Sequence, residues 1–215
     1  MTDTAPSSSK LQRMPKQTRG HQRVTAILQA CARLLIQLGV ANLTMHGIAR
    51  EAGTSIGSLY HFFSDKQQVL EALGQGHIAA MSAIAEPLHG VDESHWRGLS
   101  SRQVIEQTTL PLLQYIEQHP DLLQMLTPGY ALGQLQAPGL HVQMQNLYDR
   151  VLKARLPNAS ARQRETWGQV LLGLPLGLFQ RAQEHQELKR ELLLEEVPRA
   201  LAAYLDTIEK LLAPA

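Results

Sequence analysis

The sequence predicts an all-α protein, and three observations support this. Apolar residues recur with a period near 3.6 along most of the chain, the apolar segments are bounded by glycine, proline and helix-capping residues, and no segment alternates apolar and polar residues as a half-buried strand would. With 44% hydrophobic and 18% charged residues, the 215-residue chain has the composition of a globular protein able to bury a core.

The first three predicted helices form a compact unit. Apolar residues over 24–38 fall on one helical stripe, which Gly39 closes. Thr44 stands at the N-cap of a second, short helix that ends at Gly53, and a third helix begins at Ser55. A glycine in the tight turn between two short amphipathic helices is typical of a helix-turn-helix, because the turn requires positive φ.

The remaining helices form a longer body. A fourth helix is expected over 65–86, with Ser64 as its cap and Pro87 after its end. The next helix is expected over 100–120, bent at Pro111, and the stretch "TPGYALGQLQAPG" is expected to be a loop. Further helices are predicted over 121–126, 140–156, 160–185 and 195–212.

Charge is distributed unevenly along the chain. Residues 1–66 carry eight Lys or Arg and three Asp or Glu, whereas the remaining 149 residues carry 12 basic and 16 acidic residues. A basic N-terminal third on an acidic body favours a polyanion-binding module. Residues 1–20 are expected to be a flexible basic arm that follows nucleic acid, the alternative being a solvated tail.

The sequence contains no sign of secretion or membrane insertion. The N-terminus has no apolar core of a signal peptide, and the longest nearly continuous apolar run, 170–179, is about half the roughly 20 residues that span a bilayer. A single cysteine, Cys31, cannot form an internal disulfide and lies on an apolar helix face, where packing is the simplest role. We therefore expect a cytoplasmic protein without membrane contact.

The third helix has a face suited to DNA. If Leu59 and Phe62 point inward, the opposite face meets a partner with short or flat side chains that fit a major groove. Tyr60 and Lys66 can reach phosphate oxygens, although Tyr60 could instead be core. Thr44 and His46 are further candidates, with helix capping and solvent exposure as their alternatives. The predicted DNA-binding residues are Thr44, His46, Ser55, Ile56, Gly57, Ser58, Tyr60, His61 and Lys66.

Residues 21–70 resemble the DNA-binding domain of the TetR family of bacterial transcriptional regulators. The resemblance rests on the stretch "LIQLGVANLT", then "IAREAGTS", then "GSLYHFFSDK" followed by two apolar residues. It implies that the third helix reads the major groove and that Tyr60 and Lys66 bind phosphate. Thr54 departs from the family's usual apolar residue, and Ile56 from a polar or basic one. Ile56 then implies apolar readout of a thymine methyl, or no base contact.

The resemblance also implies a domain organisation. It places a helix-turn-helix domain at 21–66 and a helical effector-binding and dimerisation domain at 67–215, with the last two helices of each protomer forming a four-helix interface. A homodimer would bind double-stranded DNA at an inverted repeat. Glycines four residues apart beside Pro175, and an apolar stripe on the final helix, are candidates for that interface, with intrachain core as the alternative. The candidate dimer residues are Gly173, Gly177, Leu201, Tyr204, Leu205 and Ile208.

A ligand cavity is expected within the body. Kinks at Pro111 and Pro175 interrupt close packing, and methionine with aromatic residues makes an adaptable wall. Such a wall favours a small, largely apolar effector, whereas ordinary core packing is the simpler role for each residue. The candidate lining residues are Tyr115, Met125, Met144, Tyr148, Trp167 and Phe179.

Other classes of function have weaker support. No catalytic constellation, paired Cys/His spacing or glycine-rich phosphate loop is present, so we predict neither an enzyme nor a cofactor. His89 and His95 with Asp92 or Glu93 could hold a metal, but this segment is more simply a polar loop, and no metal is predicted. The sequence therefore predicts a homodimeric repressor released by a small apolar ligand. The alternative is a ligand-independent DNA-binding protein or a helical adaptor that acts through a protein partner.

Overall fold

The structure, a computed structural model, describes residues 16–126 and 138–212, and all regular structure in these ranges is helical. The all-α prediction is confirmed. The expected loop at 127–139 lies mainly outside the described residues, as do residues 1–15 of the expected basic arm, whereas residues 16–20 belong to the first helix. The elements are α1 (Lys16–Asn42), α2 (Met45–Glu51), α3 (Ile56–Phe62), α4 (Lys66–Ala85), η1 (Glu86–Gly90), α5 (Glu93–Gly98), α6 (Ser101–Thr108), α7 (Leu110–Gln118), α8 (Pro120–Met125), α9 (Pro138–Arg155), α10 (Ala161–Glu184), α11 (Lys189–Glu191), the π-helical turn η2 (Leu192–Glu196) and α12 (Val197–Leu212).

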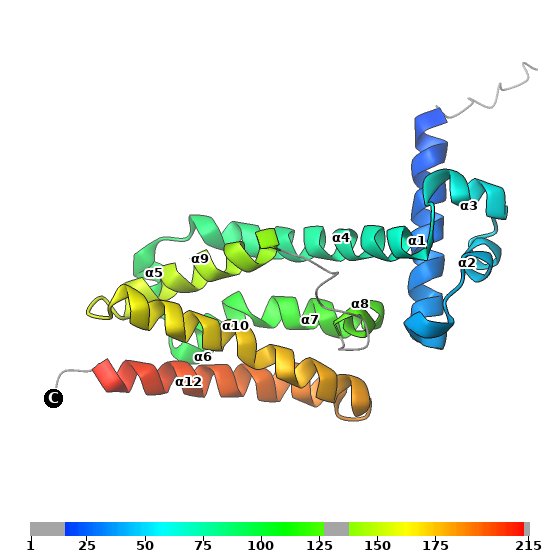
Figure 1. Cartoon of the computed structure of the whole chain (residues 1–215). Helices are drawn as coiled ribbons and strands as arrows, with labels where there is room; N and C mark the ends of the chain where they lie inside the picture. Colours follow the sequence, from blue (N-terminus) through cyan, green and yellow to red (C-terminus); the bar gives the residue numbers. More distant parts are fainter. Residues whose placement is uncertain (1–15, 127–137, 213–215) are drawn as a thin grey trace, which may run out of the picture.

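The molecule has a small lobe and an elongated body (Figure 1). Helices α1, α2 and α3 form the small lobe, and α4 leaves α1 to run along the body. In the body, α9 packs between α5 and α10, and α12 lies against α6. The C-terminal end of α12 lies at the end of the body farthest from the small lobe (Figure 1).

Local signals in the sequence fix the small lobe. Gly39 interrupts α1 with a φ of 70°, as expected for a stop, and Gly53 has a φ of 62° in the turn between α2 and α3. The side-chain oxygens of Thr44 and Ser55 accept hydrogen bonds from the backbone N–H groups of Gly47 and Ser58, so both caps lie where the sequence predicts them.

The small lobe encloses its own buried core, the N-terminal cluster. Its members are Ile27, Cys31, Leu34, Leu35, Leu43, Met45, Ile48, Ala49, Leu59, Phe63, Val69, Leu70 and Met125. The cluster extends into α4 and includes one residue of α8, so the packing crosses the expected boundary at residue 66. Residues 19–42 of α1 also form a helix long and apolar enough to cross a membrane by composition, with a mean hydropathy of 1.6 in an 18-residue window. Core helices share these properties, and α1 supplies the first four members of this cluster.

Two helix boundaries in the body differ from the expectation. Asp65 rather than Ser64 caps α4, because its Oδ1 accepts from the Gln68 N–H at 2.9 Å. The expected bent helix over 100–120 is two helices, α6 and α7, which meet at Thr109. Pro111 lies in the first turn of α7, where the missing N–H leaves no hydrogen bond unmade, so the proline starts a helix instead of kinking one.

The expected polar loop at residues 89–98 is ordered. It forms the end of η1 and all of α5, and it buries Trp96 completely. Two arginines of α9 hold it in place: Arg150 Nη2 donates to the Val91 carbonyl at 2.7 Å, and Arg155 Nη1 donates to the Trp96 carbonyl at 2.8 Å. No group of three or more potential metal-ligating side chains occurs within the described residues.

Candidate functional site

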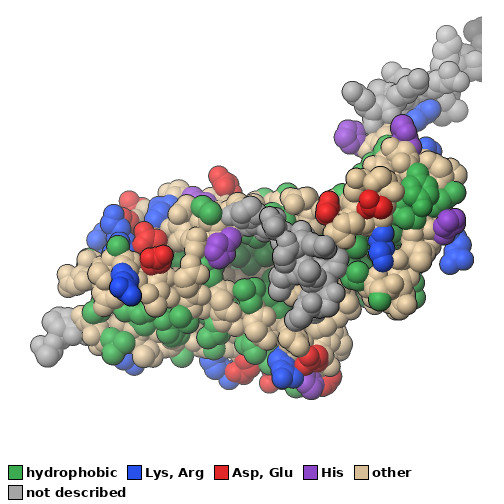
Figure 2. All heavy atoms as spheres, in the orientation of Figure 1, with side chains coloured by type: hydrophobic (Ala, Val, Ile, Leu, Met, Phe, Trp, Pro, Cys, Tyr) green, Lys and Arg blue, Asp and Glu red, His purple; other side chains and the backbone are tan. Residues whose placement is uncertain are grey.

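The face of α3 that points away from the N-terminal cluster carries most of the expected DNA-binding residues. Leu59 is fully buried beneath it, while Ser55, Gly57 and His61 are exposed. Tyr60 is 49% exposed, so the structure does not place it in the core. Lys, Arg and His side chains occur around the outside of this small lobe (Figure 2). The face can therefore present hydroxyl and imidazole groups to base edges and phosphates.

Helix α1 adds a basic residue that the sequence analysis did not single out for this face. Arg23 Nη1 donates to Ser58 Oγ on α3 at 3.3 Å, and both side chains remain accessible. The bond holds a guanidinium beside the exposed face of α3, where it can also reach a phosphate. Helical periodicity gives Arg23 an outward position but cannot indicate which later helix it meets.

Two expected DNA contacts have additional packing roles. Ile56 is half-buried and packs against the N-terminal cluster, so its side chain is directed partly inward. Lys66 is also half-buried, and its Nζ donates to the Val40 carbonyl at 3.1 Å. That carbonyl lies just after the break at Gly39, so the lysine satisfies a backbone acceptor at the end of α1. The ammonium group has two further N–H donors for a phosphate.

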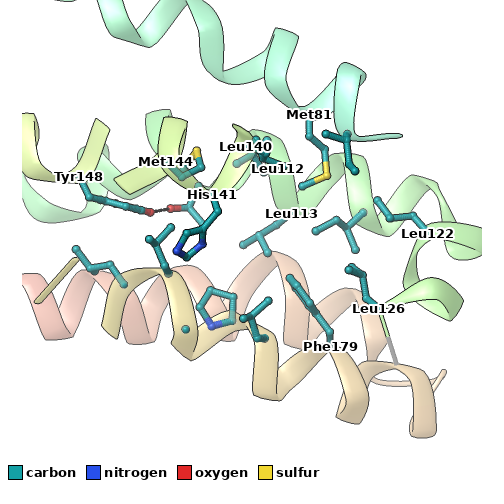
Figure 3. A pocket seen from close by; sticks show the side chains of 18 of the residues that line it. Met81, Leu112, Leu113, Leu122, Leu126, Leu140, His141, Met144, Tyr148 and Phe179 are labelled. Carbon is teal, nitrogen blue, oxygen red and sulfur yellow. Dashed lines mark hydrogen bonds between the residues drawn. The ribbon is translucent and has the colours of Figure 1, made fainter. Parts of the chain in front are cut away.

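A largely apolar cavity of about 590 Å³ lies inside the body (Figure 3). Its walls come from α4, α7, α8, α9 and α10 together with Thr109 before α7 and Leu126 after α8. Leucine, isoleucine and methionine predominate, and no Lys, Arg, Asp or Glu of the described chain lines it. Cavities of this size and composition typically hold small molecules.

The cavity has one buried polar end. There the hydroxyls of Thr109 and Tyr148 form a short hydrogen bond, which is drawn as a dashed line beside Tyr148 in Figure 3. Both side chains are buried, and burial raises the pKa of Tyr148 despite the hydrogen bonds from Thr109 and Thr108. Tyr148 therefore stays a protonated donor at neutral pH. The other polar lining residues, His141 and Gln169, are exposed.

A second buried polar cluster lies between α4, α7 and α8, and α4 and α8 also contribute to the N-terminal cluster. His77 of α4 bonds through Nε2 to Asp121 of α8 at 2.8 Å and through Nδ1 to the Tyr115 hydroxyl at 2.9 Å. His119 stacks on the Tyr115 ring, with ring centroids 3.9 Å apart. Burial pushes the pKa of Asp121 up, but the hydrogen bond and charge of His77 and two backbone N–H groups outweigh it and lower the pKa. The cluster thus fixes α4 against α8.

Sequence comparisons identify the family. Residues 27–73 match the family described as "Bacterial regulatory proteins, tetR family", and residues 101–205 match "Tetracyclin repressor-like, C-terminal domain". The chain belongs to the TetR family of transcriptional regulators. It is therefore a DNA-binding transcriptional regulator with a helix-turn-helix.

Relatives of this TetR-family protein match it over part of their length. It is 31% identical over 120 residues to the uncharacterized HTH-type transcriptional regulator YvdT of Bacillus subtilis, a match covering 55% of this chain and 57% of YvdT. It is 37% identical over 57 residues to the HTH-type transcriptional regulator PksA of B. subtilis, covering 26% of this chain and 28% of PksA. The match thus spans little more than half of YvdT and about a quarter of PksA.

Solved structures share the fold over nearly the whole chain. A transcriptional regulator from Rhodococcus sp. Rha1 superposes with a TM-score of 0.63 at 16% identity, covering 87% of this chain and 96% of that one. A gamma-butyrolactone receptor described as ArpA-like superposes with a TM-score of 0.55 at 22% identity, covering 89% and 100%. At these identities the likeness concerns the fold alone.

Three of the six expected lining residues of this TetR-family protein are in the cavity wall. Met144, Tyr148 and Phe179 line it, whereas the other three do not. Tyr115 turns its hydroxyl to His77, Met125 is buried in the N-terminal cluster, and Trp167 packs on the outer part of the body core. Periodicity marks all six as inward-facing, but only the three-dimensional arrangement decides which ones border an empty volume.

The expected dimer residues need a similar correction. Leu201, Leu205 and Ile208 are at most 2% exposed and belong to the core of their own protomer, so they do not offer a surface to a partner. Tyr204 is half-buried. Gly173 and Gly177 are exposed on α10, and a Cβ built on either would meet no atom within 4 Å. The alternative role for these two glycines was close packing against another helix of the same chain. No atom of the described residues approaches them closely enough for that role.

Proposed function

We propose that this TetR-family regulator is a homodimeric repressor that binds an inverted-repeat operator and leaves it when a small, largely apolar molecule enters the body cavity. One observation carries the proposal: the cavity and the core of the small lobe share two helices. In α4, Val69 and Leu70 belong to the N-terminal cluster, and Ile78 and Met81 line the cavity. In α8, Met125 belongs to the cluster and Leu122 lines the cavity.

Sharing these helices gives a physical route for coupling. A molecule in the cavity contacts the C-terminal half of α4 and the inner side of α8, and the His77–Asp121 pair makes the two helices move together. Movement of α4 shifts α3 in each protomer and so changes the separation of the two recognition helices. Only a ligand that binds the DNA-free arrangement more tightly lowers operator affinity, and couplings of about 1–3 kcal/mol are common.

DNA recognition is assigned to α3. We assign base contacts to Ser58 and His61 and phosphate contacts to Tyr60 and Lys66, with Arg23 as an additional phosphate contact. Ser55, Gly57, Thr44 and His46 lie at the helix starts, where backbone N–H groups and short side chains approach the DNA closely. Ile56, which packs partly inward, contributes at most an apolar contact.

The dimer surface is assigned to the exposed side of α10, which adjoins the cavity. Gly173 and Gly177 leave that side flat, and Leu176 between them is 53% exposed, although Gly173 and Leu176 also border the cavity. A flat, partly apolar helix face allows close approach of a second copy. The matched variants Gly177→Glu and Gly76→Glu test this, because both glycines are exposed on helices with open space around a Cβ. Analytical ultracentrifugation is expected to show dissociation for Gly177→Glu only; equal behaviour of both variants would contradict the assignment.

The decisive experiment starts from operator capture. Genomic fragments retained by the purified protein at physiological salt are sequenced, and the selected site is footprinted. We expect a palindrome with half-site centres roughly 34–36 Å apart or a multiple of that distance. Apolar compounds that raise the melting temperature are then titrated into the protein–DNA complex and are expected to release it. An asymmetric, singly protected site would contradict the dimer, and ligands that never release DNA would favour ligand-independent binding. No retained DNA would favour the adaptor.

A further inference from the structure

The buried end of the body cavity carries a hydrogen-bond donor whose acceptor within the protein is a distant hydroxyl. Thr109 and Tyr148 each have one hydroxyl proton, and a single proton occupies the bond between them. The second proton then belongs to one of the two hydroxyls and needs another acceptor. Within the protein that acceptor is Thr108 Oγ1, which donates its own proton to the Val104 carbonyl and lies 3.4 Å from Thr109 Oγ1, longer than the usual 2.5–3.0 Å for O–H···O bonds.

The remainder of the wall restricts the ligand in two ways. Burying an isolated charge is far more costly than burying apolar surface, and no acidic or basic side chain apart from the exposed His141 lines the cavity within the described residues. Most of the wall consists of branched aliphatic side chains such as Leu112, Leu113 and Leu172, with Phe179 as the aromatic residue besides Tyr148. This wall favours a neutral, mainly aliphatic molecule over a charged one.

We propose that the effector is a neutral, mainly aliphatic compound with a carbonyl or ether oxygen at its buried end, and that this oxygen accepts a hydrogen bond from the Thr109–Tyr148 pair. This inference rests on the proposed effector role of the cavity and specifies the chemistry that the cavity selects. A ligand without an acceptor leaves this hydroxyl proton with only the long contact to Thr108 and excludes water from it, which weakens binding of that ligand. The aliphatic part lies along apolar side chains of the wall such as Leu113 and Met144.

The test uses four probes with similar carbon chains on the full-length protein: methyl heptyl ketone, the isosteric alkene in which a methylene group replaces the carbonyl oxygen, nonanoate and nonylamine. Each displaces a neutral fluorescent reporter, N-phenyl-naphthylamine. We expect the ketone to bind roughly three- to tenfold more tightly than the alkene, the range that one hydrogen bond provides. The two charged probes are expected to bind more weakly than either.

The control is a double variant, Thr109→Val with Tyr148→Phe, which removes both hydroxyls while keeping side-chain shape. Removing both partners of a buried bond is often nearly neutral for stability, whereas either single variant leaves the other hydroxyl able to donate to the ligand. In the double variant the ketone is expected to bind only as well as the alkene, and the alkene is expected to bind at least as tightly as it does to the wild type, because no hydroxyl proton is left without a close acceptor.

The outcomes separate this inference from the proposed function. Equal binding of ketone and alkene to the wild type, or an unchanged ketone preference in the double variant, would overturn the hydrogen-bond anchor but leave the cavity as an effector site. Tighter binding of nonanoate or nonylamine would overturn the neutral class. Failure of all four probes to displace the reporter would overturn both the anchor and the effector role, while operator binding, measured separately, would stand.

Discussion

The small lobe and the body differ in where each leaves space. The lobe packs its N-terminal cluster beneath α3 and directs its unused polar groups outward, toward the side on which DNA is proposed to bind. The body packs a larger core but leaves about 590 Å³ empty within it. Because packed interiors resist deformation, the lobe can present α3 in one fixed geometry, whereas a body with an internal void can rearrange when the void is filled. Recognition and response thus occupy differently packed parts of one chain.

Truncating one buried leucine in each region gives the largest expected effect. Leu59→Ala is expected to destabilise the protein by about 2–5 kcal/mol, because it opens a new void in a filled core. Leu113→Ala, at an equally buried position that already borders the cavity, is expected to fall at or below the lower end of that range. Urea unfolding monitored by circular dichroism measures both. Equal losses would mean that the two cores are packed alike.

Enlarging a buried side chain should again cost the N-terminal cluster more stability than the cavity wall, which has room for the added atoms. Ala49→Leu in the N-terminal cluster is expected to destabilise by about 1–3 kcal/mol, because the larger side chain has no room. Leu112→Phe projects into the cavity and is expected to leave stability unchanged or raise it, while weakening the binding of apolar probes. Thermal unfolding with and without a bound probe checks both variants. A destabilised Leu112→Phe protein with unchanged probe binding would contradict the location of the cavity.

A smaller effect is expected at the outward face of the lobe. Tyr60→Phe keeps the ring and removes only the hydroxyl, so operator affinity should fall by about 0.5–1.5 kcal/mol and by the same amount on non-specific DNA. Fold stability should not change, because the side chain is half-exposed. Fluorescence anisotropy on both DNAs measures the difference. Loss confined to the operator would give Tyr60 a base contact, and no loss on either DNA would remove it from the interface.

The connection between the two regions is expected to depend on pH. The pKa of Asp121 is lowered in the folded state, so its carboxylate stabilises the fold above its unfolded pKa, near 3.9, and this contribution is lost as pH falls through the lower folded value. Asp121→Asn should therefore flatten the stability profile below about pH 4. Denaturant unfolding across that range tests this, with the exposed Asp206→Asn as control. A profile identical to wild type would show that His77 does not stabilise the charged carboxyl.

The sequence predicts the small lobe well because its determinants are local. Gly39, Thr44, Gly53 and Ser55 specify breaks and caps through their own backbone preferences, and the structure has each feature at the expected residue. The exposed face of α3 follows from the same periodicity. Arg23 was missed because its partner, Ser58, is 35 residues away and belongs to another helix.

Predictions for the body were less accurate because its features depend on how distant helices meet. The apolar stripe of α12 indicates burial but cannot distinguish a partner protomer from α6 of the same chain, which is why Leu201, Leu205 and Ile208 were assigned to the wrong surface. Likewise, Thr109 is an ordinary residue between two helices until Tyr148, 39 residues later, is placed against it. The polar sequence around Trp96 suggested a loop, since nothing local reveals the arginines that anchor it.

The alkylation rate of the single cysteine, Cys31, reports how often the packing between the small lobe and the body opens. Cys31 of α1 is fully buried, and burial together with the nearby charge of Asp121 raises its pKa to about 12, so almost no reactive thiolate exists at neutral pH. Because Cys31 lies in the N-terminal cluster, to which α8 contributes Met125, alkylation of this thiol requires the packing around α1 to open. Labelling rates followed by mass spectrometry therefore count opening events at the junction, without any engineered probe, in the free, ligand-bound and DNA-bound protein.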